Sequence, residues 1–195
     1  MKVGLGITSS FCTLNQVIKN IEQLTSLGYD VYPVVSENII KYDTRFGKSK
    51  DIINTIEQLT GKKVIKDIVG AETFGPINPM DVMVILPATG DFLAKMANGI
   101  TDNPVNLAAK ATLRNQKPLV IAVSTNDGLG LSGQNIMKLY NNKLIYFVPF
   151  GQDDYKTKPN SLIAHYDLLI PTIEQAINNI QIQPVLKEYQ KVKKK

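Results

Sequence analysis

Short apolar runs alternate with helical patterns of apolar residues along most of this chain. The apolar runs predict buried strands at Lys2–Ile7, Asp30–Val35 and residues 81–86, 118–123 and 144–148. Between these runs, apolar residues recur every three to four positions, which predicts helices. Alternating strands and helices imply right-handed crossovers. The pattern therefore predicts a doubly wound α/β domain, with a parallel sheet covered by helices on both faces.

Local signals position the helices more closely. Helices are predicted from Leu14 to Leu27, over residues 51–59 and 91–98, after Asp102 or Asn103, after Ser132 and from near Thr172. Thr13 and Gln16 form a capping-box signature for the first of them. No internal repeat or linker divides the chain. We therefore expect one α/β domain over residues 1–182 and a basic tail over residues 183–195.

Charge and hydropathy exclude two classes of partner. The formal net charge of the 195 residues is +5, but five lysines lie between Lys187 and Lys195. The body of the chain is nearly neutral, so we expect no nucleic-acid partner. No apolar run approaches the roughly 20 residues that span a bilayer, and no signal peptide is recognisable. We expect a cytoplasmic protein with no membrane partner.

The content of cysteine and histidine excludes further kinds of site. Cys12 and His165 are the only residues of their types, and tryptophan is absent. A disulfide within the chain and a zinc site built from Cys/His clusters are both excluded. We therefore predict no metal site.

Small polar residues follow each predicted strand. In a doubly wound sheet, ligands bind beyond the carboxyl ends of the strands. The loops at these ends comprise residues 8–10, 36–38, 87–91, 124–127 and 150–154, and they are rich in hydroxyls, amides and glycines. These groups suit hydrogen bonding to a phosphate and a heterocycle better than acid–base hydrolysis.

The first and third loops carry the best signals. Ser9 and Ser10 precede a helix whose N-terminus would favour a phosphate, although an ordinary turn explains them as well. Residues 87–92 are small enough for a flat ligand to approach the backbone, the alternative being a plain turn with Asp91 as N-cap. A dinucleotide fingerprint over residues 4–9, with Glu37, is a weaker interpretation. Its two glycines fall inside the predicted strand, and the third is missing.

Several segments resemble a known group of flavoproteins. Residues 87–103, PATGDFLAKMANGITDN, resemble the PASANT-type segment of the flavin-containing cysteine decarboxylase superfamily. Residues 6–10 are similar to its phosphate loop, and residues 124–126 stand in the place of its P-A-M-N segment. Within the superfamily, residues 44–47, 109–115, 124–131, 150–154 and 158–161 resemble the family of dipicolinate synthase B subunits.

The resemblance implies a fold, a cofactor and partners. The fold would be a flavodoxin-like or Rossmann-like three-layer sandwich that binds FMN and assembles as a homo-oligomer, a trimer or a multiple of it. The activity would be that of an oxidoreductase subunit in sporulating bacteria. It would take part in oxidising dihydrodipicolinate, a small dicarboxylate, to dipicolinate. The partner would be the A subunit, which would supply NAD(P).

The resemblance also implies which residues bind the cofactor. Ser9 and Ser10 would hold the flavin phosphate with help from Ser36, while Thr89 and Asp91 would border the ring and Asn126 would approach it. The expected cofactor-binding set is Thr8, Ser9, Ser10, Ser36, Thr89, Gly90, Asp91, Ser124 and Asn126.

Arg45 and Asn126 are the expected catalytic residues. Arginine suits a dicarboxylate because its planar guanidinium binds carboxylates in a bidentate manner. Arg45 is predicted in a loop and is our candidate substrate clamp, the alternative being a surface salt bridge with Asp43. Arg114, the other arginine, is predicted at a helix end, where a cation complements the helix dipole.

Two departures from the superfamily pattern leave alternatives open. Its decarboxylases have a histidine shortly before the PASANT-type strand, whereas residues 72–78 contain none and His165 lies far downstream. Asp91 also replaces the asparagine of PASANT. Decarboxylation of peptidyl cysteine is therefore disfavoured. The alternatives are a non-catalytic structural or regulatory partner of the A subunit, and a flavin-dependent decarboxylase or prenyltransferase.

Overall fold

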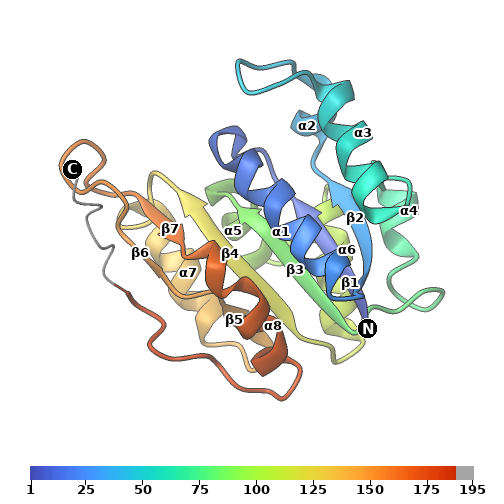
Figure 1. Ribbon diagram of the computed structural model, residues 1–195. Helices are drawn as coiled ribbons and strands as arrows, with labels where there is room; N and C mark the ends of the chain where they lie inside the picture. The colour runs from blue at the N-terminus through green and yellow to red at the C-terminus, as the bar shows by residue number, and fades with distance from the viewer. Residues whose placement is uncertain (188–195) are drawn as a thin grey trace.

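A parallel sheet forms the centre of the molecule in the computed structural model, which describes residues 1–187. Its strands are β1 (Lys2–Ile7), β2 (Asp30–Val35), β3 (Val82–Ala88), β4 (Leu119–Thr125) and β5 (Ile145–Phe147). They lie in the order β2-β1-β3-β4-β5 (Figure 1). This is the flavodoxin-like order. The five predicted strands are confirmed, although β3 and β4 begin one residue and end two residues later than expected.

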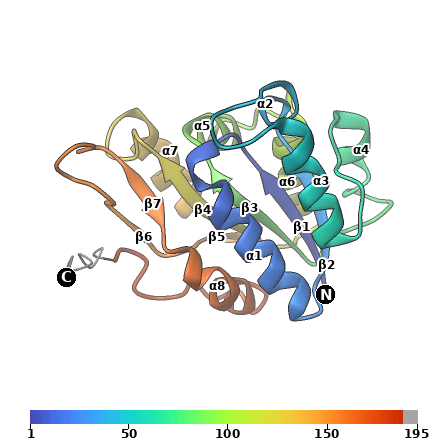
Figure 2. The ribbon, with the colours of Figure 1, turned by 45° about the horizontal axis from the view of Figure 1, so that its top comes forward.

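Helices cover both faces of the sheet, as the alternating pattern predicts. Figures 1 and 2 show α1 and α8 on one face and α5, α6 and α7 on the other. The helices are α1 (Leu14–Ser26), α2 (Glu37–Lys41), α3 (Ser49–Thr60), α4 (Ile68–Glu72), α5 (Gly90–Ala97), α6 (Pro104–Arg114), α7 (Leu131–Tyr140) and α8 (Leu169–Ala176). Val17, Ile21 and Leu24 of α1 are fully buried because their spacing places them on one side of the helix.

A short antiparallel hairpin extends the sheet and was not predicted. It consists of β6 (Phe150–Gly151) and β7 (Leu162–Ala164). β7 pairs with the end of β4, whose first half pairs with β5. The same edge of β4 therefore has two successive neighbours. As a result, the loop between β6 and β7 lies at the carboxyl end of β4.

The predicted start of α1 at Leu14 is confirmed, but its capping is not, and the starts of α7 and α8 differ from the predicted ones. Thr13 makes no capping box; its hydroxyl donates to the Ser10 carbonyl at 2.8 Å, inside the 3-10 turn η1 (Phe11–Thr13). Ser132 lies in the first turn of α7, and the Asp127 carboxylate caps that helix by accepting from the Leu131 and Ser132 N–H groups. α8 begins before Thr172, since the chain already turns into a helix at Leu169.

Of the remaining helix predictions, some are confirmed and others are not. Of the two candidate caps for α6, Asn103 is the cap, because its side chain accepts from the Asn106 N–H at 3.0 Å. α5 begins at Gly90, so Asp91 lies in its first turn and Thr89 is the N-cap. The short helices α2 and α4 were not predicted, since five residues give too few positions for a visible period.

The outer edge of β5 is occupied by a side chain instead of a strand. The Gln181 amide accepts a hydrogen bond from the Phe147 N–H and donates one to the Phe147 carbonyl, each at 2.8 Å. These two bonds reproduce what a neighbouring strand would supply.

The chain stays attached to the domain up to Lys187. The Phe150 N–H donates to the Val185 carbonyl and the Lys187 N–H donates to the Phe150 carbonyl, each at 2.9 Å. Residues 185–187 thus run beside β6, and the remainder of the predicted tail, residues 188–195, lies outside the described residues.

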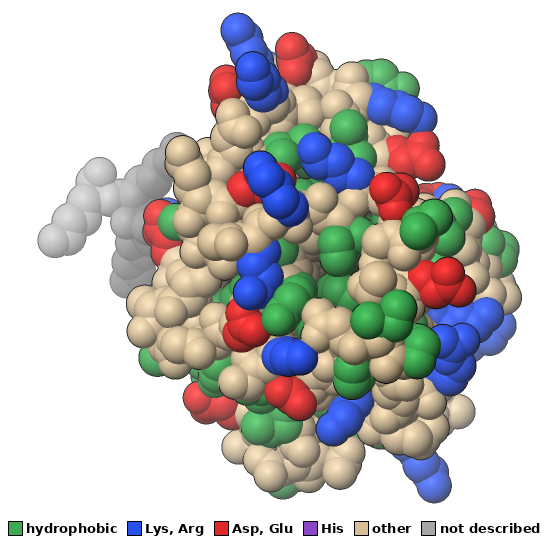
Figure 3. Space-filling view, turned by 90° about the vertical axis from the view of Figure 1, so that its right-hand side faces the viewer, with side chains coloured by type: hydrophobic (Ala, Val, Ile, Leu, Met, Phe, Trp, Pro, Cys, Tyr) green, Lys and Arg blue, Asp and Glu red, His purple; other side chains and the backbone are tan. Residues whose placement is uncertain are grey.

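The described surface agrees with the nearly neutral charge of the body of the chain. Figure 3 views the molecule from the right-hand side of Figure 1. On this face, basic and acidic side chains are interspersed, and no basic area is visible. Within residues 1–187, no helix is both long and apolar enough to cross a membrane.

Candidate functional site

A cleft of about 320 Å³ lies at the carboxyl ends of the strands, where the strand order reverses. The reversal is between β1 and β3, which is where ligands bind in sheets of this type. We call it the β1/β3 cleft. The predicted residues that line it are Thr8, Ser9, Ser36, Thr89 and Asp91. Residues that were not predicted to bind a ligand complete the lining, chiefly Asn38, Lys95, Asp102 and Asn106.

Thr8 ties together the two loops that form the floor of the cleft. Its hydroxyl donates to the Pro87 carbonyl at 2.7 Å and accepts from the Thr89 N–H at 3.2 Å. The residue is only 4% exposed. The Thr8 hydroxyl thus uses both its hydrogen-bond donor and an acceptor within the protein. Thr8 therefore shapes the cleft, and its side chain has no donor left for a ligand.

Replacing Thr8 by valine is expected to destabilise the protein by about 1–3 kcal/mol, because the substitution leaves a buried carbonyl and a buried N–H without their partner. Urea unfolding measures the change. Thr8→Ser keeps the hydroxyl and is the control. Equal stability of the valine and serine variants would contradict the assigned role.

Two further hydroxyls of the cleft differ from that of Thr8. Ser9 receives only a long hydrogen bond, 3.4 Å from the Asn38 amide. The Ser36 oxygen is buried and has no hydrogen-bond partner among the described residues. A buried polar atom left in this state is destabilising, and most such atoms in proteins are paired. Ser36 therefore has an unused donor and acceptor at the edge of the cleft.

Acidic side chains dominate the electrostatics of the cleft. Lys95 lies 3.4 Å from Asp91 and 3.3 Å from Asp102. Burial alone would lower the pKa of Lys95, but the two carboxylates outweigh it and the pKa is raised. Hydrogen bonds from Asn103 and then Lys95 lower the pKa of Asp102. Glu37 is the third carboxylate and pairs with Lys41 at 2.7 Å. With one lysine of the described lining facing three carboxylates, an anion here must be held mainly by neutral donors.

The other predicted cofactor residues divide between a second, smaller pocket and the protein interior. Ser10, Ser124 and Asn126 line a pocket of about 70 Å³ beside the end of β4. Gly90 lines neither pocket. A Cβ on Gly90 would lie 2.8 Å from the Ser132 hydroxyl, so the glycine allows α5 to approach α7. Gly90 thus has a packing role, and its contact with a cofactor stays a prediction.

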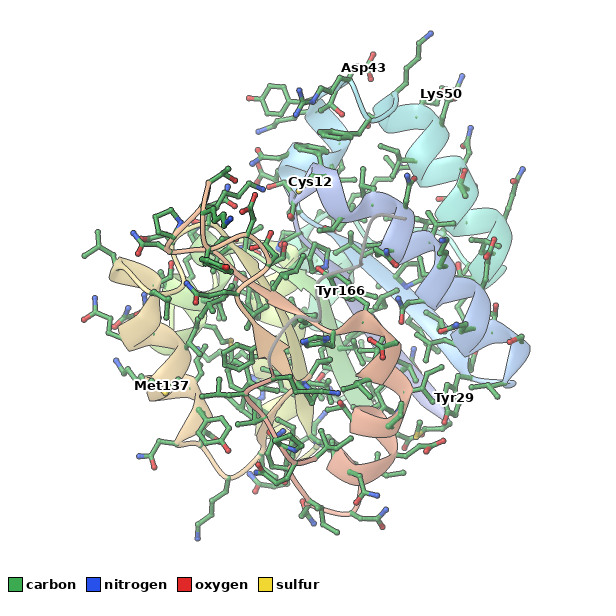
Figure 4. The ribbon with its side chains drawn as sticks, turned by 60° about the vertical axis from the view of Figure 1, so that its left-hand side comes forward. Cys12, Tyr29, Asp43, Lys50, Met137 and Tyr166 are labelled. Carbon is green, nitrogen blue, oxygen red and sulfur yellow. The ribbon has the colours of Figure 1, made fainter. Side chains whose placement is uncertain are left out.

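Arg45 lies away from both pockets. It is exposed in a tight turn closed by two backbone hydrogen bonds between Thr44 and Gly47. Its guanidinium is 4.8 Å from the centre of the Phe46 ring. Asp43, labelled at the projecting end of the molecule in Figure 4, accepts from the Ser49 N–H instead of pairing with Arg45. Within one chain, the two expected catalytic residues, Arg45 and Asn126, are not brought together.

Sequence reasoning missed two groups of lining residues, for different reasons. Asn106 and Lys95 lie on helices, where polar residues usually face solvent. Lys95 falls within the resembling segment 87–103, and Asn106 lies three residues after the capping residue Asn103. Lys158 and Ser161 line the small pocket because the unpredicted β6–β7 hairpin carries them there. His165 lines neither pocket; burial, and then the charge of Lys187, lower its pKa.

Comparison with known proteins agrees with the fold and identifies relatives. The Flavoprotein family model matches residues 1–156. The B subunit of dipicolinate synthase of Bacillus subtilis (strain 168) is 50% identical over 187 residues, 96% of this chain and 94% of that protein. The crystal structure of the dipicolinate synthase B subunit from Bacillus halodurans C superposes with a TM-score of 0.88 at 50% identity, covering 96% of each chain.

A more distant structure shares the fold. The dodecameric FMN-dependent UbiX-like decarboxylase from Escherichia coli O157:H7 superposes with a TM-score of 0.62 at 19% identity. The match covers 76% of this chain and 80% of that one.

Proposed function

This chain belongs to the Flavoprotein family, and from that premise we propose that its β1/β3 cleft binds FMN. The observation that carries the proposal is the buried, unpaired hydroxyl of Ser36 at the edge of this cleft. A phosphate oxygen would supply the missing partner. The position of the cleft, at the β1/β3 reversal, supports the same ligand.

The donor set of the cleft fits a phosphate held without arginine. Ser9 and Ser36 offer hydroxyls that make few bonds within the protein, and Ser10 lies next to them. Thr89 and Asp91, which line the cleft, would border the ring, and Asn126, which lines the adjoining small pocket, would approach it from the end of β4. Thr8 and Gly90 support the surrounding loops, and Ser124 supports Ser10 through a 2.9 Å hydrogen bond.

The reaction we propose is the oxidation of a dihydrodipicolinate-type substrate to dipicolinate. The 50% identity to the B subunit of a dipicolinate synthase, over nearly the full length of both chains, supports it. Aromatising the ring removes a hydride equivalent and a proton from the substrate, and FMN, where bound, would supply the two-electron acceptor for the hydride. The name of the relative implies an A subunit. We propose that this partner supplies NAD(P) and that the pair acts during sporulation.

Arg45 fits this proposal only in an assembly. It lies on a projecting turn outside the pockets of its own chain, so a clamping role requires a neighbouring copy of the protein. We propose a homo-oligomer, a trimer or a multiple of it, in which Arg45 contacts substrate held by an adjacent copy. The dodecameric state of one structural neighbour supports an assembly of this kind.

FMN binding is tested by adding the purified protein to FMN and measuring the flavin fluorescence. We expect saturable binding of one FMN per chain. Ser36→Ala should weaken the affinity about tenfold to a hundredfold, because a hydrogen bond to a charged group is lost. Ser26→Ala, at an exposed position on α1, is the control. Absence of binding, or equal affinity of the Ser36→Ala variant and the native protein, would overturn the proposal.

A non-catalytic role is the second candidate. Among the described residues, those that line the two pockets include no histidine, and the carboxylates of the cleft are exposed or ion-paired. No strongly basic group of this lining is therefore poised to take the proton. Dihydrodipicolinate oxidation assayed with the A subunit alone, with this chain alone and with the mixture separates the candidates. Equal rates for the A subunit and the mixture would favour the structural role.

A further inference from the structure

The small pocket at the end of β4 is formed by several segments of the chain, and we call it the β4 pocket. Ser10 comes from the first loop and Cys12 from η1, while Ser124 lies at the end of β4 and Asn126 directly follows it. The antiparallel pairing of β4 with β7, at Ser124 and Thr125, brings the loop between β6 and β7 against them. The unpredicted hairpin therefore supplies one wall of the pocket.

The β4 pocket lies beside the β1/β3 cleft. The Ser10 and Ser124 hydroxyls are 2.9 Å apart and join the ends of β1 and β4 across the end of β3. Ser10 follows Ser9, which lines the cleft, so adjacent residues of one loop face the two cavities. A ligand whose ring lies at the mouth of the cleft can therefore extend a substituent into the β4 pocket.

The size of the β4 pocket limits its occupant. Its volume is about 70 Å³, compared with about 320 Å³ for the cleft. A water molecule takes roughly 30 Å³ of liquid. The β4 pocket thus has room for a small group such as a carboxylate, and no room for an aromatic ring.

Hydrogen-bond donors outnumber carboxylates around the β4 pocket. The hydroxyls of Ser10, Ser124 and Ser161, the Asn126 amide and the Lys158 ammonium all line it. Lys158 lies within 4 Å of no carboxylate among the described residues. Within the described lining, Asp153 is the single acidic group and is exposed. The balance favours an anionic occupant over a cationic one.

Tyr166 supplies an independent sign of a missing partner. The residue is only 8% exposed, and its hydroxyl has no hydrogen bond among the described residues. Burial raises the pKa of this phenol, and the nearby Ser124 and Thr13 hydroxyls oppose part of the rise. Tyr166 does not itself line the pocket, and its hydroxyl lies near those of Ser124 and Thr13. Figure 4 shows Tyr166 deep in the molecule, below Cys12.

We propose that the β4 pocket binds one carboxylate of a planar dicarboxylate whose ring lies at the mouth of the β1/β3 cleft, beside the FMN of the proposed function. Lys158 supplies the positive charge, and the serine hydroxyls, with Tyr166 near that of Ser124, supply hydrogen bonds. This inference rests on the proposed function, because the dicarboxylate is the product of the proposed reaction. It adds Lys158 as a residue that determines which ring substituents are accepted.

The test is calorimetric titration with pyridine-2,6-dicarboxylate in metal-free buffer, of both FMN-loaded and FMN-free protein. Lys158→Met should weaken binding of the dicarboxylate about tenfold or more while FMN affinity stays unchanged. Lys156→Met, an exposed lysine of the same loop that does not line the pocket, is the matched control. Pyridine-2-carboxylate, which has one carboxylate fewer, should be less sensitive to Lys158→Met.

The outcomes separate this inference from the FMN proposal. If the protein binds FMN but not the dicarboxylate, or if Lys158→Met and Lys156→Met bind the dicarboxylate equally well, the β4 pocket is not the carboxylate site. If FMN fails to bind while dicarboxylate binding still depends on Lys158, the pocket assignment stands and the flavin proposal fails. Tyr166→Phe provides a second variant, expected to give a smaller loss of dicarboxylate affinity in a folded protein.

Discussion

Replacing Gly6 by valine is expected to lower the free energy of unfolding by about 3 kcal/mol, because the site has no room for a side chain. A Cβ at this position would lie 2.7 Å from Val105 and 2.8 Å from Ile85, both fully buried. Ile85 can move its terminal methyl, but the short Val105 side chain cannot. The added methyl groups would therefore push α6 away from β1.

Urea unfolding followed by circular dichroism measures this loss of stability. Gly61→Ala is the comparison. Gly61 has open space around it but a φ of 66°, so alanine there meets only backbone strain, roughly 1 kcal/mol. A Gly6→Val variant as stable as Gly61→Ala would show that β1 and α6 pack more loosely than these distances imply.

Replacing Lys95 by glutamine is expected to weaken FMN binding about thirtyfold. Among the described residues, Lys95 is the only lysine lining the β1/β3 cleft, and it compensates Asp91 and Asp102. Without it, the phosphate would face uncompensated carboxylates. Two unit charges about 8 Å apart interact by about 2 kcal/mol at an effective dielectric constant of about 20, which corresponds to that loss.

Removing a negative charge from the cleft should have the opposite effect on the affinity for FMN. Asp91→Asn removes one carboxylate and should tighten FMN binding, most clearly at low salt, where screening is weakest. Lys138→Gln, at an exposed lysine on α7, is the control for a general change of charge. Fluorescence titrations at two salt concentrations measure all three variants. Unchanged affinity for both Lys95→Gln and Asp91→Asn would show that the phosphate lies elsewhere.

Much of the fold could be predicted from the sequence because β1 and β3 are almost wholly buried. Buried parallel strands are continuous apolar runs, and these stand out from the polar loops around them. The two glycines of the dinucleotide fingerprint considered for residues 4–9 also lie inside a strand, as the sequence predicted. Gly4 and Gly6 lie within β1 and face buried side chains, which explains why they form a packing contact and no dinucleotide turn.

The arrangement of the candidate site could be predicted only in part. The loops after β1 and β3 follow from strand positions, and Ser9, Ser36 and Thr89 line one cleft as expected. Ser124 lines a separate pocket, which depends on the hairpin of β6 and β7. These strands have only two and three residues, too few to show an alternating pattern of apolar and polar positions. Nor does any local pattern indicate that the Thr8 hydroxyl is used within the protein, since its partners lie about 80 positions away in the chain.

The Gln181 side chain on β5 has a consequence for association between molecules. β5 is only three residues long, and the N–H and carbonyl of Phe147 are bonded to the glutamine amide. A strand from another molecule would have to displace both bonds before it could pair there. The amide thus protects the sheet against polymerisation edge to edge. When copies of this protein associate, this edge of the sheet is therefore expected to stay unpaired with other chains.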